Sequence, residues 1–191
     1  MFYRPAEGHG LPHSPFSAIV SPRPIGWIST RSSMGDNLAP YSFFNAVAYV
    51  PLQVMFSGDH SDTVAAVRET GRFAVNTVSR DQWRVMNETS AGFPRGVDEF
   101  AACGVDKAEC VTIDCPRVAG SAATLECLAT QIIDLEGGES TLVIGRVEGV
   151  HIGDAYLTEG RFDVVKAQMM ARLGYMDYTQ VTGTVELKRP R

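Results

Sequence analysis

The chain has 191 residues, of which 45% are hydrophobic and 20% are charged, and its net charge is −5. These values are typical of one folded globular domain and exclude an intrinsically disordered chain. The negative charge disfavours nucleic acid and anionic membranes as main partners. No apolar run approaches the length of a membrane span, and no secretory signal is recognisable at the N-terminus.

In chain order, we expect residues 1–15 to form an extended N-terminal arm and residues 16–191 to form a single domain. Short apolar runs separated by turn signals predict several strands, at 16–20, 25–30, 38–47, 52–56, 73–78, 124–135 and 142–152. The Gly-Gly pair between the last two runs is typical of a hairpin turn. Many short strands with few helices predict a mainly β protein, either a β-barrel or a sandwich.

Three helices are expected, at 62–70, 79–90 and 97–103, because the first two segments carry capping residues at their start and the third ends at Gly104. All three lie between the fourth strand and the last hairpin, so we expect one helical insert.

The first motif is a pair of apolar runs, 23–30 and 37–45, that carry hydroxyl and amide side chains among aromatics. This mixture suits a flat heteroaromatic ligand. In a continuous strand, Tyr41, Phe43 and Asn45 would share one face, with Ser42 on the other. At the end of the first run, Ser29, Thr30 and Arg31 enter a turn, where they could meet an anion or a ring edge. An ordinary barrel wall remains the alternative.

The second motif is the segment 56–63, in which a strand is followed by a loop and a capped helix. The free N–H groups at a helix N-terminus favour a phosphate. Ser57, Ser61 and Thr63 could add hydroxyl donors. The N-cap is either Ser61 or Asp62, and we expect Asp62 to cap the helix rather than to contact a ligand. Capping without any ligand is the alternative.

A third, weaker motif contains Arg172 and Tyr175, which could pair with a phosphate and stack on a ring. They could equally cover the surface of the last strands.

Several other sites are not expected from the sequence. It has no Rossmann glycine motif, no P-loop and no nucleophile elbow. The cysteines lack Cys-x-x-Cys spacing, and Gly10 and Pro12 separate His9 from His13, so no metal site is expected. We expect reduced thiols in a cytoplasmic protein, with Cys127 in the core.

The chain resembles the flavin reductase-like family of FMN-binding split-barrel proteins, including its flavoredoxin-like members. Besides the two runs, the resemblance rests on the segments 62–63, 73–76, 86–90, 96–100, 102–105, 125–127 and 172–175. It implies a split β-barrel, a homodimer and FMN near the dimer interface. The residues implied to bind FMN are Ser29, Thr30, Arg31, Ala39, Tyr41, Ser42, Phe43, Asn45, Ser57, Ser61, Thr63, Arg172 and Tyr175.

One departure from the family pattern is Ser61, where the family often has Lys before its Asp-Thr pair. Arg31 or Arg172 could replace the missing positive charge.

The resemblance implies an FMN-dependent oxidoreductase of the NAD(P)H:flavin reductase type, with NADH or NADPH as hydride donor and a monooxygenase as a candidate partner. The flavin carries the redox chemistry, so no catalytic side chain is named. The alternatives are an electron-transfer flavoprotein and a non-catalytic flavin-binding module.

Overall fold

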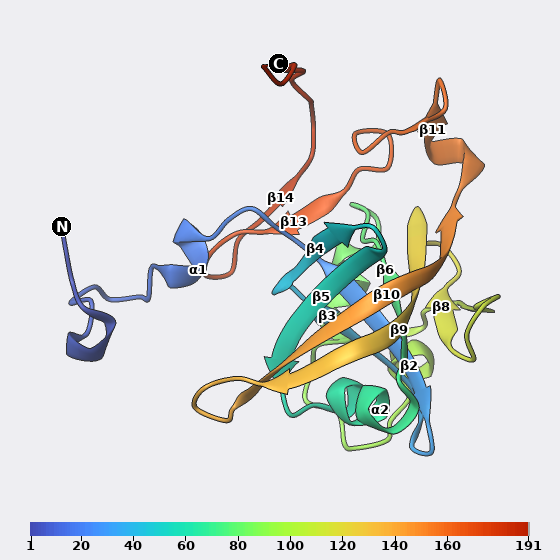
Figure 1. Ribbon diagram of the computed structural model, residues 1–191, viewed down its shortest axis with the longest axis horizontal. Helices are drawn as coiled ribbons and strands as arrows, with labels where there is room; N and C mark the ends of the chain where they lie inside the picture. Colours follow the sequence, from blue (N-terminus) through green and yellow to red (C-terminus); the bar gives the residue numbers. More distant parts are fainter. Residues whose placement is uncertain (191) are drawn as a thin grey trace.

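Seven strands form one antiparallel sheet in a computed structural model that describes residues 1–190; residue 191, within the predicted domain, lies outside the described part. Their spatial order is β3-β2-β6-β9-β10-β5-β4, and the sheet curves into a split β-barrel whose edge strands are β3 and β4 (Figure 1). The mainly β fold is therefore confirmed. The strands are β2 (Gly26–Ser32), β3 (Gly35–Tyr41), β4 (Phe44–Tyr49), β5 (Leu52–Asp59), β6 (Arg72–Asn76), β9 (Ala123–Asp134) and β10 (Ser140–Ile152).

The hairpin of β9 and β10 is confirmed and forms the longest pairing in the sheet. Gly137 and Gly138 both adopt positive φ, at 92° and 73°, which a glycine accepts without steric cost. The N–H of Leu135 donates to the Ser140 carbonyl at 2.8 Å and closes the turn.

The interior of the barrel holds one hydrophobic core, in which Phe56, Phe73 and Val143 are completely buried. Helix α2 (Asp62–Thr70) closes one end of the barrel with Val64 and Val67 (Figure 1).

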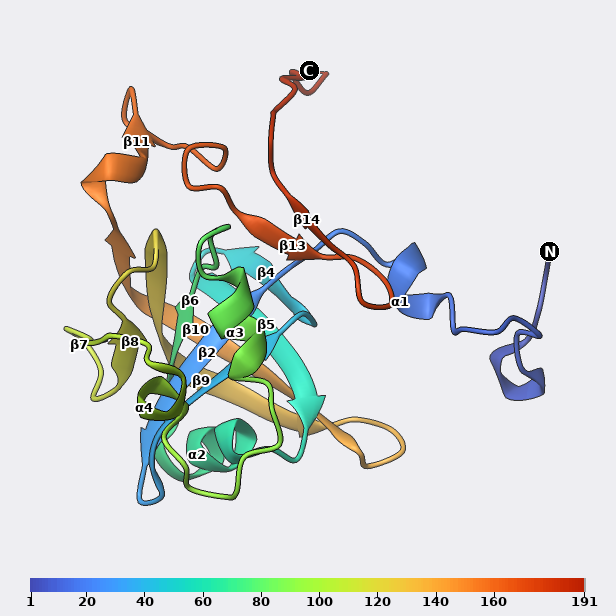
Figure 2. The same ribbon diagram turned by 180° about the vertical axis from the view of Figure 1, so that it is seen from behind.

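A second core lies on the outer face of β2 and β3, where α3 (Trp83–Glu88) and α4 (Glu99–Cys103) cover the sheet (Figure 2). Trp27 is fully buried there, and its indole N–H donates to Thr89 Oγ1 at 2.9 Å. The next residue of β2, Ile28, is fully buried in the barrel core, so the strand is covered on both faces and neighbouring residues belong to different cores.

The remaining elements are short and lie around the barrel. They are α1 (Phe16–Ile19), β1 (Arg23–Pro24), β7 (Lys107–Glu109), β8 (Pro116–Val118), β11 (Leu157–Thr158), β12 (Arg161–Phe162), β13 (Met170–Arg172), β14 (Tyr178–Gln180) and the 3₁₀ turns Pro5–Glu7 and Asp154–Tyr156. In Figure 1 the N-terminal arm and the C-terminal tail both project from the barrel. None of the helices in residues 1–190 has the length and apolar character needed to cross a membrane.

The prediction of a strand at 16–20 is wrong, because this segment forms helix α1. Its first turn follows Pro15, whose carbonyl accepts hydrogen bonds from the N–H groups of Ala18 and Ile19. At its end, the guanidinium of Arg23 donates to the carbonyls of Ser17 and Val20. These contacts satisfy the backbone locally and leave no strand partner.

The prediction of one strand over 38–47 is also wrong. The chain bends at Ser42 and Phe43, so that β3 pairs with β2 and β4 pairs with β5. Tyr41 is therefore buried, whereas Phe43 and Asn45 are exposed, and the three side chains do not share one face.

The three expected helices exist, but they do not form one insert, since strand β6 separates α2 from α3 and α4. Helix α3 begins at Trp83, after a turn in which Gln82 Oε1 accepts from the N–H of Ser79 at 3.3 Å. Helix α4 begins after Asp98, whose carboxylate accepts from two N–H groups of its first turn.

A buried carboxylate on β9 anchors the loop between β7 and β8. Glu126 is fully buried and accepts hydrogen bonds from the N–H groups of Val111 at 2.7 Å and Thr112 at 2.6 Å, and from the His151 ring. Burial alone would raise the pKa of Glu126, but the hydrogen bonds outweigh it and lower the pKa to about 2.

Replacing Glu126 by Gln should lower the free energy of unfolding at neutral pH by about 3 kcal/mol, because a pKa lowered from 4.5 to about 2 stabilises the folded protein by roughly that amount. This stabilisation is complete above pH 4.5 and is lost as the pH falls toward 2. Urea unfolding of both proteins, from neutral pH to about pH 2.5, measures the difference. A difference that stays constant with pH would contradict the assignment.

Candidate functional site

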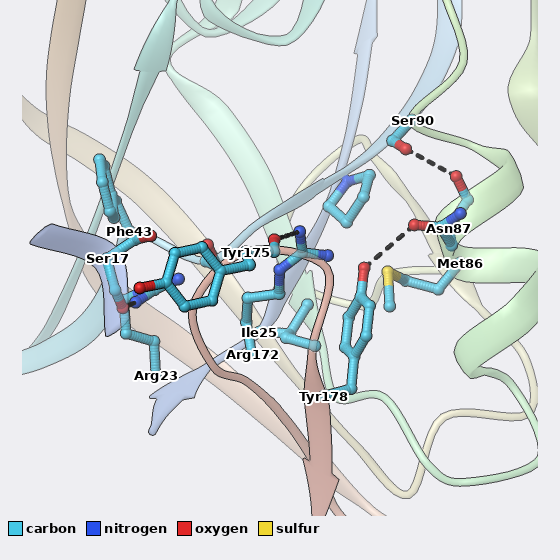
Figure 3. Close-up of a pocket in the computed structure, with 12 residues that line it drawn as sticks. Ser17, Arg23, Ile25, Phe43, Met86, Asn87, Ser90, Arg172, Tyr175 and Tyr178 are labelled. Carbon is cyan, nitrogen blue, oxygen red and sulfur yellow. Dashed lines mark hydrogen bonds between the residues drawn. The ribbon is translucent and has the colours of Figure 1, made fainter. Parts of the chain in front are cut away.

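Two cavities meet at Pro40 and Ser90, where β3 ends beside the end of α3. The first, the arginine cavity, has a volume of about 410 Å³ and is defined by Arg23, Phe43, Arg172, Tyr175 and Tyr178 (Figure 3). The second, the helix cavity, has a volume of about 370 Å³ and is defined by Ala39, Tyr41, Ser61, Thr63 and Arg95. Each is large enough for part of a cofactor.

The wall of the arginine cavity is held by hydrogen bonds visible in Figure 3. Arg172 Nη2 donates to the Tyr175 carbonyl at 2.6 Å, and the Arg172 guanidinium lies 4.4 Å from the centre of the Tyr178 ring. The Tyr178 hydroxyl donates to Asn87 Oδ1 at 3.0 Å. These contacts link β13 and β14 to helix α3 across the cavity.

The helix cavity is built at the N-terminus of α2. Ser61 is the N-cap, since its Oγ accepts from the N–H of Val64 at 3.4 Å, and the same oxygen lies 2.7 Å from the Tyr41 hydroxyl. Asp62, which we expected to cap the helix, instead accepts from Arg95 Nε at 2.9 Å and from the N–H of Gly96 at 3.0 Å. It therefore ties the loop before α4 to the helix.

Two buried ionisable side chains, Glu99 and Tyr41, line this cavity. Glu99 accepts from the N–H of Leu38 at 2.9 Å and from the Asn37 amide, whose Oδ1 in turn accepts from the Thr63 hydroxyl at 2.6 Å. Burial raises the pKa of Glu99, and these hydrogen bonds offset part of the shift. Burial likewise raises the pKa of Tyr41, partly offset by its hydrogen bond with Ser61.

The structure brings together eight of the residues predicted to bind the cofactor. Four line the helix cavity and four line the arginine cavity; they are Ala39, Tyr41, Ser61 and Thr63, and Ser42, Phe43, Arg172 and Tyr175. Asn45 lines a neighbouring hollow between α1 and β4.

The other four predicted residues line neither cavity. Ser29 and Thr30 are fully buried, and the Ser29 hydroxyl donates to the Pro116 carbonyl at 2.7 Å. The Ser57 side chain lies on β5, and its N–H donates to the Phe43 carbonyl at 2.8 Å.

Arg31 lies beyond these residues on β2 and is bound by three carboxylates. Its guanidinium pairs with Asp36 at 2.7 Å and with Glu109 and Asp114, each at 2.9 Å, and these hydrogen bonds raise its pKa. It is therefore not positioned to replace the missing lysine.

Sequence reasoning missed Arg23, Arg95, Asn87 and Ser90, which line the two cavities. Arg95 lies between Pro94 and Gly96 in the loop that connects α3 to α4. These residues predict a turn, but they do not indicate which part of the fold the turn contacts. Only the fold brings this loop to the start of α2.

The chain is similar to known proteins both in sequence and in structure. A family model described as the flavin reductase like domain matches residues 19–179. The chain is 27% identical to nitrilotriacetate monooxygenase component B from Bacillus cereus, with a TM-score of 0.86 and coverage of 90% of each chain. It is 30% identical to the 2-nitrobenzoate 2-nitroreductase NbaA from Pseudomonas fluorescens, with a TM-score of 0.84 and coverage of 92% of this chain and 88% of that one.

A third solved structure confirms the predicted split barrel. A protein from Shewanella frigidimarina, described as having a split barrel domain, is 20% identical, with a TM-score of 0.83 and coverage of 92% of this chain and 90% of that one. At this identity the likeness shows the fold alone.

The contact of Tyr41 with Gly58 positions the start of α2, and it can be tested. A Cβ atom at Gly58 would lie 2.4 Å from Tyr41 Cε1, so Gly58→Ala must displace the ring from Ser61 and should destabilise the protein by about 1–3 kcal/mol. Gly92→Ala is the control, since nothing lies within 4 Å of a Cβ atom there. Urea unfolding measures both, and equal stabilities of the two variants would refute the tight contact.

Proposed function

Because the chain belongs to the flavin reductase-like family, we propose that it is an FMN-dependent oxidoreductase of the NAD(P)H:flavin reductase type. The observation that carries this proposal is the junction of the two cavities at Pro40. One cavity has aromatic walls suited to a flat ring, and the other opens on a helix N-terminus suited to a phosphate. A molecule with a ring at one end and a phosphate at the other fits both.

The proposed binding site of the FMN phosphate is the first turn of α2. The leading N–H groups of a helix have no acceptor within it, and the helix dipole places partial positive charge there. Arg95 lies beside this turn, held by Asp62, with its side chain 68% exposed. We propose that Arg95 supplies the charge that the family often takes from a lysine in the position of Ser61.

The proposed binding site of the flavin ring is the chain between β3 and β4. Within residues 1–190, the N–H groups of Ser42 and Phe43 donate to no protein acceptor. Free N–H groups beside a cavity can bind the oxygen and nitrogen atoms at the edge of a flavin and stabilise negative charge there. Bound FMN would supply the hydride-accepting ring, with NADH or NADPH as the donor.

The proposal also covers the oligomeric state and the cellular compartment of the protein. Apolar side chains are exposed along and beside β4, among them Val47, Tyr49, Val50 and Leu52, and we propose that a second copy of residues 16–191 covers them in a cytoplasmic homodimer. The similarity to a monooxygenase component supports a monooxygenase as the consumer of the reduced flavin.

Anaerobic titration tests the activity most simply. The purified protein is loaded with FMN, and the flavin absorbance is followed as NADH or NADPH is added without oxygen. Bleaching by one nicotinamide would support the proposed reductase. Bound flavin that neither nicotinamide bleaches would instead favour an electron carrier or a flavin-binding module, and absence of flavin binding would refute the proposal.

Replacing Arg95 by Gln should weaken FMN binding by about 3- to 10-fold, because one partly exposed positive charge is lost beside the phosphate. Riboflavin lacks the phosphate, so its affinity should not change. Arg4→Gln, on the exposed N-terminal arm, is the charge-matched control. Fluorescence titrations of the wild-type protein and the two variants with each ligand give the six affinities, and an equal loss for FMN and riboflavin in Arg95→Gln would place the phosphate elsewhere.

A further inference from the structure

Two cysteines face each other where the hairpin of β7 and β8 (Figure 2) meets its loop. Cys110 and Cys115 continue the register of the two strands, in which Glu109 is opposite Pro116. The N–H of Cys110 donates to the Cys115 carbonyl at 3.0 Å. Residues paired in this way have Cα atoms about 5.5 Å apart, within the range of about 4.4–6.8 Å that a disulfide spans. The backbone therefore allows a bond between the two sulfur atoms, although both are free thiols in this structure.

The side chains of Cys110 and Cys115 lie on the same side of the hairpin. They pack with Ala74 in a small hydrophobic cluster that is separate from the barrel core. The neighbouring Cys110 thiol, and then burial, raise the pKa of the Cys115 thiol. The other two cysteines lie elsewhere, since Cys127 packs in the barrel core and Cys103 ends helix α4. The fold therefore pairs Cys110 with Cys115 specifically.

The two paired thiols differ in their access to solvent. Cys115 is completely buried, and its S–H donates to the Ser29 carbonyl at 3.2 Å. Cys110 is half-buried, and Val111, the next residue in the loop, is 81% exposed. A small polar oxidant can therefore reach Cys110 first, and Cys115 is held beside it as the second thiol.

The loop that joins the two cysteines is fixed at several points. Glu126 accepts from the N–H of Thr112 at 2.6 Å. Glu109 and Asp114, which precede the two cysteines in the chain, each pair with the Arg31 guanidinium at 2.9 Å. Because the backbone is already ordered, a bond between the two sulfurs needs little further loss of chain entropy.

We propose that Cys110 and Cys115 are a redox modification site, where hydrogen peroxide converts the two thiols to a reversible disulfide. The Cys110 sulfur attacks one peroxide oxygen, the O–O bond breaks, and the thiol proton leaves with the other oxygen as water. The Cys115 sulfur then attacks the resulting sulfenic acid, so that the S–S bond forms, the S–O bond breaks and the Cys115 proton leaves in a second water. The two thiols lose two electrons and two protons, and the peroxide is reduced to two water molecules.

The oxidant is one that the proposed function itself supplies. Reduced flavin that reacts with oxygen yields hydrogen peroxide, so a flavin reductase is exposed to it. Disulfides in cytoplasmic proteins are usually transient and serve redox sensing or catalysis. The chemistry at Cys110 and Cys115 uses no flavin, so the inference goes beyond the proposed function and does not require it.

Peptide mapping tests the disulfide directly. Trypsin cleaves after Lys107 and Arg117, so residues 108–117 leave as one peptide that contains both cysteines and no other. The folded protein without flavin is treated with a small excess of hydrogen peroxide, quenched with catalase, and unfolded in urea with N-ethylmaleimide. This peptide should be unalkylated and about 2 Da lighter than its dithiol form, while the peptides with Cys103 and Cys127 stay alkylated. Dithiothreitol should restore two alkylated cysteines.

Three variants separate the roles of the thiols. Cys103→Ser removes a half-buried thiol outside the pair and is the matched control, which should leave the disulfide unchanged. Cys110→Ser should slow oxidation of Cys115 at least about 10-fold relative to the wild-type protein, because the remaining thiol is buried. Cys115→Ser should stop the reaction at the Cys110 sulfenic acid, which dimedone traps. The wild-type map is informative even if a variant does not fold.

The inference would be overturned if the wild-type peptide kept two alkylated cysteines at peroxide concentrations that oxidise Cys103. Sulfinic acid at Cys110 without a bond to Cys115, or disulfides that join two chains through Cys103, would contradict it equally. These measurements use protein without flavin, so a failure to bind FMN would refute the proposed function and leave their outcome unchanged.

Discussion

The bend at Ser42 and Phe43 is the constraint on which the rest of the site depends. It moves the chain from pairing with β2 to pairing with β5, and so leaves the barrel split between β3 and β4. The bend needs room on both sides. A Cβ atom on Gly26 would lie 2.9 Å from Phe44 Cγ, and one on Gly58 would lie 2.4 Å from Tyr41 Cε1. Glycine at these positions lets the two rings pack where the strands part.

The consequences of this bend reach both cavities. Tyr41 packs over Gly58, and its hydroxyl is hydrogen-bonded to Ser61 at the N-cap of α2, so the end of β3 determines where the helix begins.

The two cavities differ in charge. Two carboxylates that line the helix cavity, those of Asp62 and Glu99, are bound by Arg95 or by amide groups, whereas the guanidinium groups of the arginine cavity have only neutral partners. The same groove therefore offers two different anion environments on either side of Pro40.

Local signals in the sequence were sufficient for elements that depend on neighbouring residues. The Gly137–Gly138 turn and the helix that ends at Gly104 could both be predicted, because caps and turns act over a few residues. A change of strand partner has no such signal, so 38–47 was interpreted as one strand. The role of Ser29 was missed for the same reason, since its hydroxyl is satisfied by a carbonyl 87 residues away. Arg23 and Arg172 are likewise brought together only by strand pairing.

The central claim is that the two cavities form one slot for a phosphorylated ring, and a crystal structure of the protein with FMN tests it most directly. The account predicts electron density for the phosphate at the first turn of α2, near Ser61, and for the ring along Pro40 to Phe43. Density that places the phosphate between Arg23 and Arg172, or leaves both cavities without the ligand at saturating FMN, would contradict it.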